Sequence, residues 1–270
     1  MCSLATLEQW AQYGIRGKVA YGKPAMALPY RRTLPAKIEK AIARLTELDE
    51  ATQGQWYVSV SFGVDSLLAY HLASTLNPNV TAVWVNQGPL AEWPDCLALK
   101  DLMLSMGMNL VELPPDISLM DWYKNHGLPM AAGMTSADDK ALNEALMYAP
   151  IRRYNESSGM KGHAWGLRAQ GENRRRGMLI SQRGELYQRK DGLWVASPVA
   201  RWSKVEIFAY LDSRALPYPA MYDLNRAEIR NGPPIGTTGA NLGRLDKLKQ
   251  YFPEIWRVFV MEFPEIQRFA

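Results

Sequence analysis

The chain has 270 residues, of which 47% are hydrophobic and 21% charged, and this composition excludes disorder as its general state. No apolar run approaches the roughly 20 residues of a membrane-spanning helix. Two cysteines are too few for a cysteine-rich metal site or a disulfide framework. We therefore expect a soluble, cytoplasmic protein that has no membrane partner.

Strand and helix patterns alternate along the chain after an N-terminal arm, residues 1–33, which shows no clear period. Short β-branched or apolar runs predict strands at residues 56–60, 80–85, 109–113 and 162–166. Apolar positions at helical spacing predict helices at residues 35–49 and 139–157, and a capping box predicts another at 204–213. The segments 66–76 and 92–106, which each follow a predicted strand, are expected to be helices as well. Two short helical pieces, each after a Phe-Pro pair, close the chain.

Such alternation is typical of a parallel sheet with helices on both faces. The predicted fold class is therefore α/β: a three-layer, Rossmann-like sandwich around a mainly parallel sheet, with a helical C-terminal region. We expect three parts, namely the arm at residues 1–33, a main domain at 34–230, and a helical extension at 231–270 packed on it. In such folds a ligand binds at the carboxyl ends of the strands.

The segment Ser61-Phe62-Gly63-Val64-Asp65-Ser66 joins the first predicted strand directly to a helix. Backbone N–H groups at such a junction, together with the partial positive charge of a helix N-terminus, suit phosphate groups. Gly63 leaves room for a phosphate beside the backbone, and the hydroxyls of Ser61 and Ser66 can donate to phosphate oxygens. Asp65 would repel phosphate, so we expect it to cap the helix or to hold a Mg²⁺ ion that bridges the phosphates. An ordinary strand-to-helix turn is the alternative.

This Ser-x-Gly-x-Asp-Ser pattern resembles the pyrophosphate loop of the adenine nucleotide α-hydrolase (PP-loop ATP pyrophosphatase) superfamily. Members commonly attack the α-phosphorus of ATP or hold a preformed adenylyl group. Phe62 stands where Gly is usual, and the Ser-Phe-Gly version resembles the phosphoadenosine phosphosulfate (PAPS) reductase branch. The resemblance implies that residues 61–66, Val64 included, bind ATP, or else PAPS or adenylyl sulfate (APS). It makes residues 34–230 a nucleotide-binding domain, with Mg²⁺ on Asp65.

A second segment, residues 165–175, resembles the Gly-Leu-Arg … Arg segment of PAPS reductases and the Gly-Ala-Arg-Arg … Glu … Arg segment of the ATP sulfurylase small subunit. The resemblance continues through a short hairpin expected at 178–188 and covers residues 55–223. Arginine suits the role because its planar fork binds phosphate bidentately. The resemblance implies catalytic roles for Asp65, Arg168 and Arg175, with Gly166 and Glu172 beside the nucleotide.

The basic residues of the chain are concentrated around this segment. Residues 151–190 hold ten Lys and Arg and three acids, a local charge of +7, whereas the whole chain has a net charge of +4. Such a concentration suggests an anionic ligand. A solvated basic face, or a surface that meets a polynucleotide, is the alternative.

Val85 and Asn86 end the second predicted strand, which in the resembling family lies beside the adenosine. Asn86 departs from the more usual Asp: an amide can bind base or ribose but supplies no formal charge. The alternative is that Asn86 is a turn residue before Gly88.

The chain departs from PAPS reductases at its C-terminal end, where it lacks their Glu-Cys-Gly-(Leu/Ile)-His motif and has no cysteine after Cys96. The thiolate is the nucleophile of that reaction, so we expect no reductase activity. The expected function is ATP α,β-bond cleavage or adenylyl transfer to an unknown acceptor, with release of pyrophosphate. The alternatives are a sulfonucleotide (PAPS/APS) reductase or sulfotransferase-like enzyme, a component of a nucleic-acid modification system, and a non-catalytic nucleotide sensor. A homo-oligomer stays open.

Overall fold

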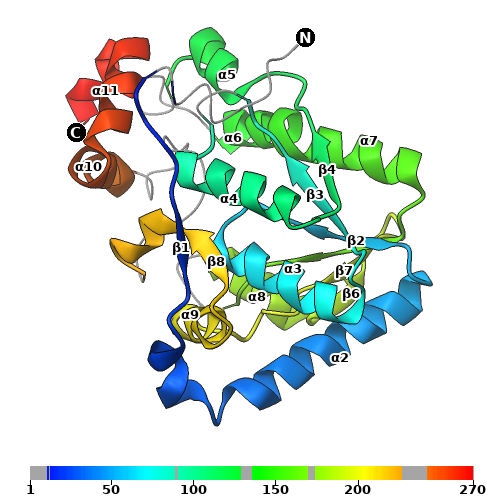
Figure 1. Ribbon diagram of the computed structural model, residues 1–270. Coiled ribbons are helices and arrows are strands. Elements are labelled where there is room, and N and C mark those ends of the chain that lie inside the picture. The colour runs from blue at the N-terminus through cyan, green and yellow to red at the C-terminus, as the bar shows by residue number, and fades with distance from the viewer. Residues whose placement is uncertain are drawn as a thin grey trace.

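A six-stranded sheet lies at the centre of the structure, a computed structural model that describes residues 11, 13–88, 91–128, 136–169, 174–226 and 242–269 (Figure 1). The strand order is β4-β3-β2-β5-β7-β6, and all neighbours run parallel except β6 and β7. The strands are β2 (Trp56–Ser59), β3 (Thr81–Val85), β4 (Leu110–Leu113), β5 (Gly162–Trp165), β6 (Leu186–Gln188) and β7 (Trp194–Ala196). The expected α/β fold with a mainly parallel sheet is therefore confirmed.

Helices cover both faces of this sheet, with α2, α3 and α4 on one side and α6 and α7 on the other (Figure 1). Alternate side chains of β2 contact the two layers. Trp56 Nε1 donates to Asp49 of α2 at 2.6 Å, whereas the Tyr57 ring meets the Tyr154 ring of α7. The helices are α2 (Leu34–Thr52), α3 (Val64–Leu76), α4 (Pro94–Ser105), α5 (Leu119–His126), α6 (Ser136–Asn143), α7 (Ala149–Ser158), α8 (Arg174–Arg183), α9 (Lys204–Ser213), α10 (Leu242–Tyr251) and α11 (Pro253–Glu262).

The N-terminal arm, which we expected to be irregular, contains a strand and a 3₁₀ helix. Strand β1 (Val19–Tyr21) pairs antiparallel with β8 (Pro217–Pro219), and η1 (Pro24–Tyr30) follows. The Lys23 N–H anchors the arm by donating to the buried Asp212 carboxylate at 2.8 Å. The sequence pattern missed β1 because a three-residue strand has no period of its own and forms only with a distant partner.

The hairpin expected at residues 178–188 is wrong: residues up to Arg183 belong to helix α8, and the hairpin consists of β6 and β7. Gly184 ends the helix with a φ of +83°, and Gly192 forms the hairpin turn with a φ of +87°. The helix expected at 139–157 is longer and is interrupted by a π-helical turn, η2 (Glu144–Tyr148), between α6 and α7. Helix α5 was not predicted.

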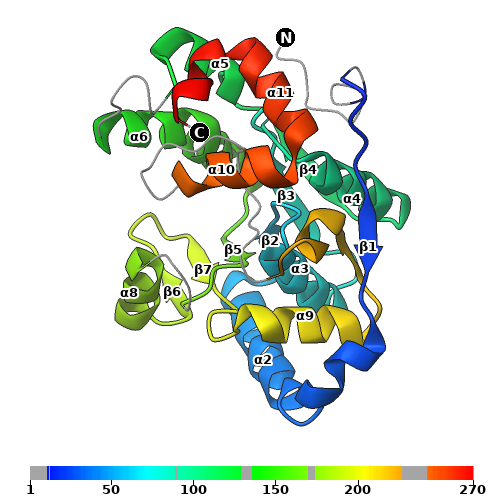
Figure 2. The same ribbon diagram turned by 90° about the vertical axis from the view of Figure 1, so that its left-hand side faces the viewer.

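The C-terminal helices α10 and α11 lie together at one end of the molecule, beside α5 (Figure 2). Aromatic rings join them to the α/β sandwich: Phe252 contacts Trp93 at a centroid distance of 4.8 Å, and Phe263 contacts Tyr123 at 6.3 Å. A helical C-terminal region therefore packs against the sandwich, whereas the expected boundaries at residues 33 and 230 stay predictions. Within the described residues, no helix is both long enough and apolar enough to cross a membrane.

Candidate nucleotide site

The loop between β2 and α3 is held closed by its own hydroxyl groups. Ser66 Oγ accepts the Ser61 N–H at 3.1 Å, donates to the Gly63 carbonyl at 3.0 Å, and lies 3.2 Å from Ser61 Oγ. We expected the Ser66 hydroxyl to donate to a phosphate, but in the structure it donates to the loop itself. Ser66 thus shapes the loop that the sequence identified.

Phe62 has an unusual backbone conformation for a residue with a side chain. Its φ is +56°, in the left-handed region that disfavours such residues by about 1–2 kcal/mol. The side chain is only 3% exposed and meets the Trp84 ring edge-to-face at 5.5 Å, so burial offsets the strain. Gly63 is the N-cap of α3 and has ordinary extended angles, φ −80° and ψ 156°. Its backbone conformation therefore does not require glycine.

Asp65 and Arg168 form an ion pair at the N-terminus of α3. Arg168 Nε donates to Asp65 Oδ2 at 3.0 Å, and the two side chains are 11% and 32% exposed, respectively. The other oxygen of Asp65, Oδ1, is buried and has no hydrogen-bond partner within the described part of the chain. Asp65 does not cap the helix, because Gly63 is the N-cap and no side chain bonds to the first turn there. The 61–66 loop and the arginine segment at residues 165–175 thus contact each other through this pair.

Gly166 at the end of β5 allows this meeting. A Cβ atom at this position would lie 2.5 Å from both the Asp65 carbonyl carbon and the Ser66 amide nitrogen. The chain on either side of it is braced by a loop after β7: Trp165 Nε1 donates to Ser197 Oγ at 2.7 Å, and the Ala169 N–H donates to the Ala200 carbonyl at 2.8 Å. The absence of a side chain at Gly166 therefore places Arg168 beside the loop.

Asn86 follows the last residue of β3, Val85, and is completely buried. Its amide nitrogen donates to Glu112 Oε1 at 2.7 Å, and its oxygen accepts the Gly88 N–H at 3.0 Å. These contacts are those of the turn residue that we considered as the alternative. A contact of Val85 or Asn86 with nucleotide stays a prediction.

Two further predicted site residues, Glu172 and Arg175, belong to the arginine segment. Glu172 lies outside the described residues, and Arg175 is placed as the second residue of α8 without a described side chain. The basic residues around it are spread over several elements and pair with acids: Arg152 with Glu144, Arg153 with Asp116, and Arg189 with Asp191. Acids outside residues 151–190 thus compensate part of the local charge of +7.

Two residues with potentially reactive side chains in the described part of the chain, Cys96 and His71, have structural surroundings. Cys96 is buried in α4, and burial raises the pKa of its thiol well above the usual value. His71 of α3 hydrogen-bonds Tyr210 at 2.8 Å and is structural. No group of three or more His, Cys, Asp or Glu that could hold a metal ion occurs among the described residues.

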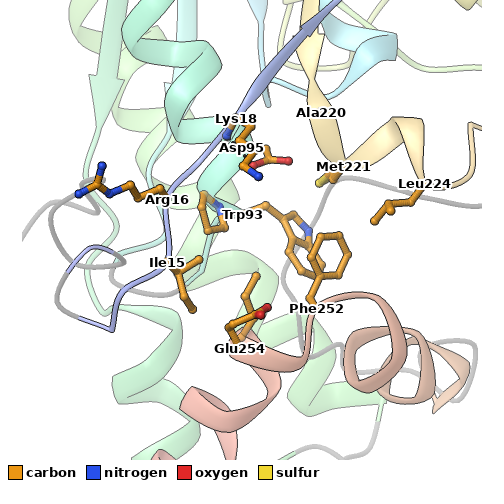
Figure 3. Close-up of a pocket in the computed structure, with 12 residues that line it drawn as sticks. Ile15, Arg16, Lys18, Trp93, Asp95, Ala220, Met221, Leu224, Phe252 and Glu254 are labelled. Carbon is orange, nitrogen blue, oxygen red and sulfur yellow. Dashed lines mark hydrogen bonds between the residues drawn. The ribbon is translucent and has the colours of Figure 1, made fainter.

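A cavity of about 270 Å³ lies apart from the loop residues (Figure 3). It is lined by the segment before β1, the start of α4, the η3 turn (Ala220–Asp223) with Leu224, and the start of α11. Trp93 and Phe252 form its aromatic wall, with Asp95 and Glu254 to either side in Figure 3. Burial raises the pKa of the Asp95 carboxyl. No residue of the 61–66 loop lines this cavity, so it is a separate feature.

Comparison with known proteins supports the identification suggested by the two motifs. The family model described as "Phosphoadenosine phosphosulfate reductase domain" matches residues 55–229. A phosphoadenosine 5'-phosphosulfate reductase of Xanthomonas campestris pv. campestris is 26% identical over 174 residues, covering 64% of this chain and 68% of that protein. A phosphoadenosine 5'-phosphosulfate reductase of a Synechococcus species is 23% identical over 166 residues, covering 62% and 68%.

The fold is shared with a solved structure as well. The phosphoadenylyl-sulfate reductase of Candida auris, solved as a phosphate complex, superposes with a TM-score of 0.50 at 16% identity, over 66% of this chain and 81% of that one. Because the family model spans more than half of the chain and includes both the loop and the arginine segment, the chain belongs to the phosphoadenosine phosphosulfate reductase domain family.

Proposed function

We propose that the chain binds ATP at the 61–66 loop and cleaves its α,β-phosphate bond, transferring the adenylyl group to an acceptor and releasing pyrophosphate. The observation that carries this proposal is the Asp65–Arg168 pair at the N-terminus of α3, where the 61–66 loop enters the helix. The N-terminus of α3 and the Arg168 guanidinium lie side by side there, and both kinds of group bind phosphate oxygens in proteins. The family is one of nucleotide-binding enzymes, which agrees with this ligand class.

The reaction needs positioning and charge neutralisation rather than a protein nucleophile. The acceptor attacks the α-phosphorus, a new bond to phosphorus forms, and the α,β P–O bond breaks so that pyrophosphate leaves with the electron pair. The N–H groups of the loop hold the phosphates, and the Arg168 guanidinium stabilises the charge that develops on the leaving group. Asp65 orients Arg168 through the bond to Nε.

Asp65 also fits a magnesium ion. Mg²⁺ commonly binds one or two carboxylates together with substrate phosphates, and Asp65 Oδ1 is a buried carboxylate oxygen with no hydrogen-bond partner in the described structure. When bound there, the ion would neutralise phosphate charge and polarise the bond that breaks. The other residues named above act by binding and orienting the nucleotide.

Reduction of a sulfonucleotide is the second candidate, because the relatives named above are PAPS reductases. Against it stands Cys96: its thiol is buried and its pKa is raised, so it is a poor thiolate nucleophile. This candidate predicts that replacing the two cysteines abolishes all activity.

The test is to incubate the protein with ATP and Mg²⁺, with candidate acceptors present, and to measure release of pyrophosphate and AMP. Binding is measured separately by the shift of melting temperature with ATP, GTP, PAPS and APS, because a ligand that binds only the native state stabilises it. ATP should stabilise more than GTP. Stabilisation by PAPS alone, with thiol-dependent release of sulfite, would establish the second candidate instead.

A further inference from the structure

A buried lysine packs against the ends of strands β3 and β4, beside the candidate site. Lys100 of α4 is only 8% exposed, and burying a lysine costs free energy unless its charge is compensated. Its Nζ lies 3.6 Å from Glu112 Oε2 of β4 and 5.0 Å from the centre of the Trp84 ring of β3; a more exposed acid, Asp101, lies 4.0 Å away. Lys100 is therefore held by one carboxylate and one aromatic face.

The two main partners of Lys100 are neighbours in the sheet. Trp84 and Glu112 are register partners of the parallel strands β3 and β4, so both side chains extend from the same face of the sheet toward α4. A single cation from α4 therefore contacts both strands at once. Residues of three elements are fixed relative to one another by this contact.

One branch of contacts leads from this cluster to the phosphate loop. The Trp84 ring meets Phe62 at 5.5 Å, and Phe62 is the loop residue with the left-handed backbone. A residue keeps such a conformation only when its surroundings hold it there. A displaced Trp84 would remove the surface against which Phe62 is held.

The other branch leads to the end of β3. Glu112 uses its second oxygen, Oε1, to accept the amide N–H of Asn86 at 2.7 Å, and Asn86 in turn accepts the Gly88 N–H. Asn86 is therefore oriented by the carboxylate that also compensates Lys100. The turn after β3 and the loop after β2 thus share one anchor.

We propose that Lys100 is a positioning residue for the nucleotide: it holds Trp84 and Glu112, and through them sets the geometry of the 61–66 loop and of the turn at residues 86–88. This inference rests on the proposed nucleotide site. Lys100 acts without touching the nucleotide, so its removal changes affinity only by loosening the loop and the turn.

The informative substitution is Lys100→Met, which removes the charge and keeps an unbranched side chain of similar length. We expect it to weaken ATP and AMP binding alike, by about two- to thirtyfold, the range for residues coupled to a site without ligand contact. Both nucleotides should be affected because the turn at residues 86–88 is expected beside the adenosine, which ATP and AMP share. Arg168→Ala, in contrast, should affect ATP more than AMP.

The chain contains a matched control. Lys37 of α2 has the same two kinds of partner, since its Nζ lies 5.9 Å from the Trp202 ring centre and 2.7 Å from Glu206 Oε2. This cluster joins α2 to the start of α9 and involves no residue of the candidate site. Lys37→Met should therefore lower the melting temperature without changing nucleotide affinity.

The experiment is calorimetric titration of ATP and AMP into wild type, Lys100→Met, Lys37→Met and Glu112→Gln, each shown to be folded by circular dichroism. Hydrogen exchange of the nucleotide-free proteins is measured alongside. Lys100→Met and Glu112→Gln should weaken binding and speed exchange at the amides of residues 61–63 and 88, whereas Lys37→Met should do neither. Glu112→Gln keeps an acceptor for Asn86 and decides the matter if Lys100→Met does not fold.

Failure of the role of Lys100 and failure of the proposed function would give different results. Wild-type affinity and wild-type exchange in both Lys100→Met and Glu112→Gln would overturn the role of Lys100 while leaving the proposed function intact. A wild-type protein that binds neither ATP nor AMP would overturn the proposed function. In that case the exchange at residues 61–63 and 88 alone decides whether Lys100 positions these segments.

Discussion

Gly166 lies directly against the first turn of α3, so that a Cβ atom on it would stand 2.5 Å from the Asp65 carbonyl carbon. No side chain fits that gap, because the opposing atoms are backbone and cannot move independently of the helix. The close approach brings the end of β5 to the phosphate loop and makes the ion pair between Asp65 and Arg168 geometrically accessible.

Gly166→Ala should therefore separate β5 from α3. We expect a loss of about 1–3 kcal/mol in the free energy of unfolding, the range for overpacked sites, together with loss of nucleotide affinity. Urea denaturation and ATP titration measure the two effects. The control is Gly107→Ala, at a position with a φ of +90° and no heavy atom within 4 Å of the added Cβ, which should cost stability through backbone strain alone. Equal nucleotide affinity in both variants would contradict this prediction.

Gly63→Val should abolish nucleotide binding while leaving the fold intact. The φ of −80° and ψ of 156° at Gly63 suit a β-branched residue, so the backbone permits valine. The branched side chain would instead occupy the space in which a phosphate approaches the loop. Calorimetry with ATP checks the binding, and circular dichroism checks the fold. A folded Gly63→Val protein that binds ATP normally would place the phosphates elsewhere.

Arg168→Ala should weaken ATP binding by about tenfold to a hundredfold or more, which corresponds to the roughly 1.5–3 kcal/mol of a charge-assisted hydrogen bond. The loss should be larger for ATP than for AMP, because AMP lacks the terminal phosphates. Arg168→Lys should recover only part of it, since lysine cannot bind bidentately. The control is Arg153→Ala, whose partner Asp116 lies on the surface. Unchanged ATP affinity in Arg168→Ala would make the ion pair with Asp65 purely structural.

Replacing Cys2 and Cys96 together by Ala should leave nucleotide binding and pyrophosphate release unchanged. Cys96 is buried in α4 with a raised thiol pKa, and the proposed reaction uses no thiolate. Pyrophosphate assays on the double variant, with melting curves to confirm folding, test this. A folded variant without any activity would restore a thiol mechanism.

Glu92 should make the stability of the protein depend on pH. Burial raises the pKa of its carboxyl to about 8, with a hydrogen bond from Trp84 acting in the opposite direction. A carboxyl whose pKa is higher in the folded state than in the unfolded state stabilises the fold fully at low pH. This stabilisation is lost as the pH rises from 4.5, the usual pKa of the group, through about 8, its pKa in the folded protein. Glu92→Gln stays neutral throughout, so relative to wild type it should gain stability between pH 5 and pH 8. Urea denaturation at pH 5 and at pH 8 measures the free energy of unfolding of both proteins. A difference between the two proteins that is the same at both pH values would refute the raised pKa.

Local patterns along the chain predicted the order and type of most elements and identified both motifs of the site. Apolar spacing located α2, and a capping box located α9 at residues 204–213, because these signals depend on neighbours a few positions away. The strand-loop-helix pattern at 61–66 is equally local. Gly166 also belongs to a local sequence motif, but the contact that requires glycine there is made with the distant residues Asp65 and Ser66.

The way in which these segments meet follows from the packing of the whole chain. Asp65 and Arg168 are 103 residues apart and touch because β5 lies next to β2 in the sheet, an adjacency that no local pattern encodes. The same holds for β1, which exists only through its pairing with β8, and for Lys100, which reads as one more helix residue in the sequence. Strand order and the burial of individual charges are properties of the packed chain, since they depend on contacts between residues that are distant in sequence.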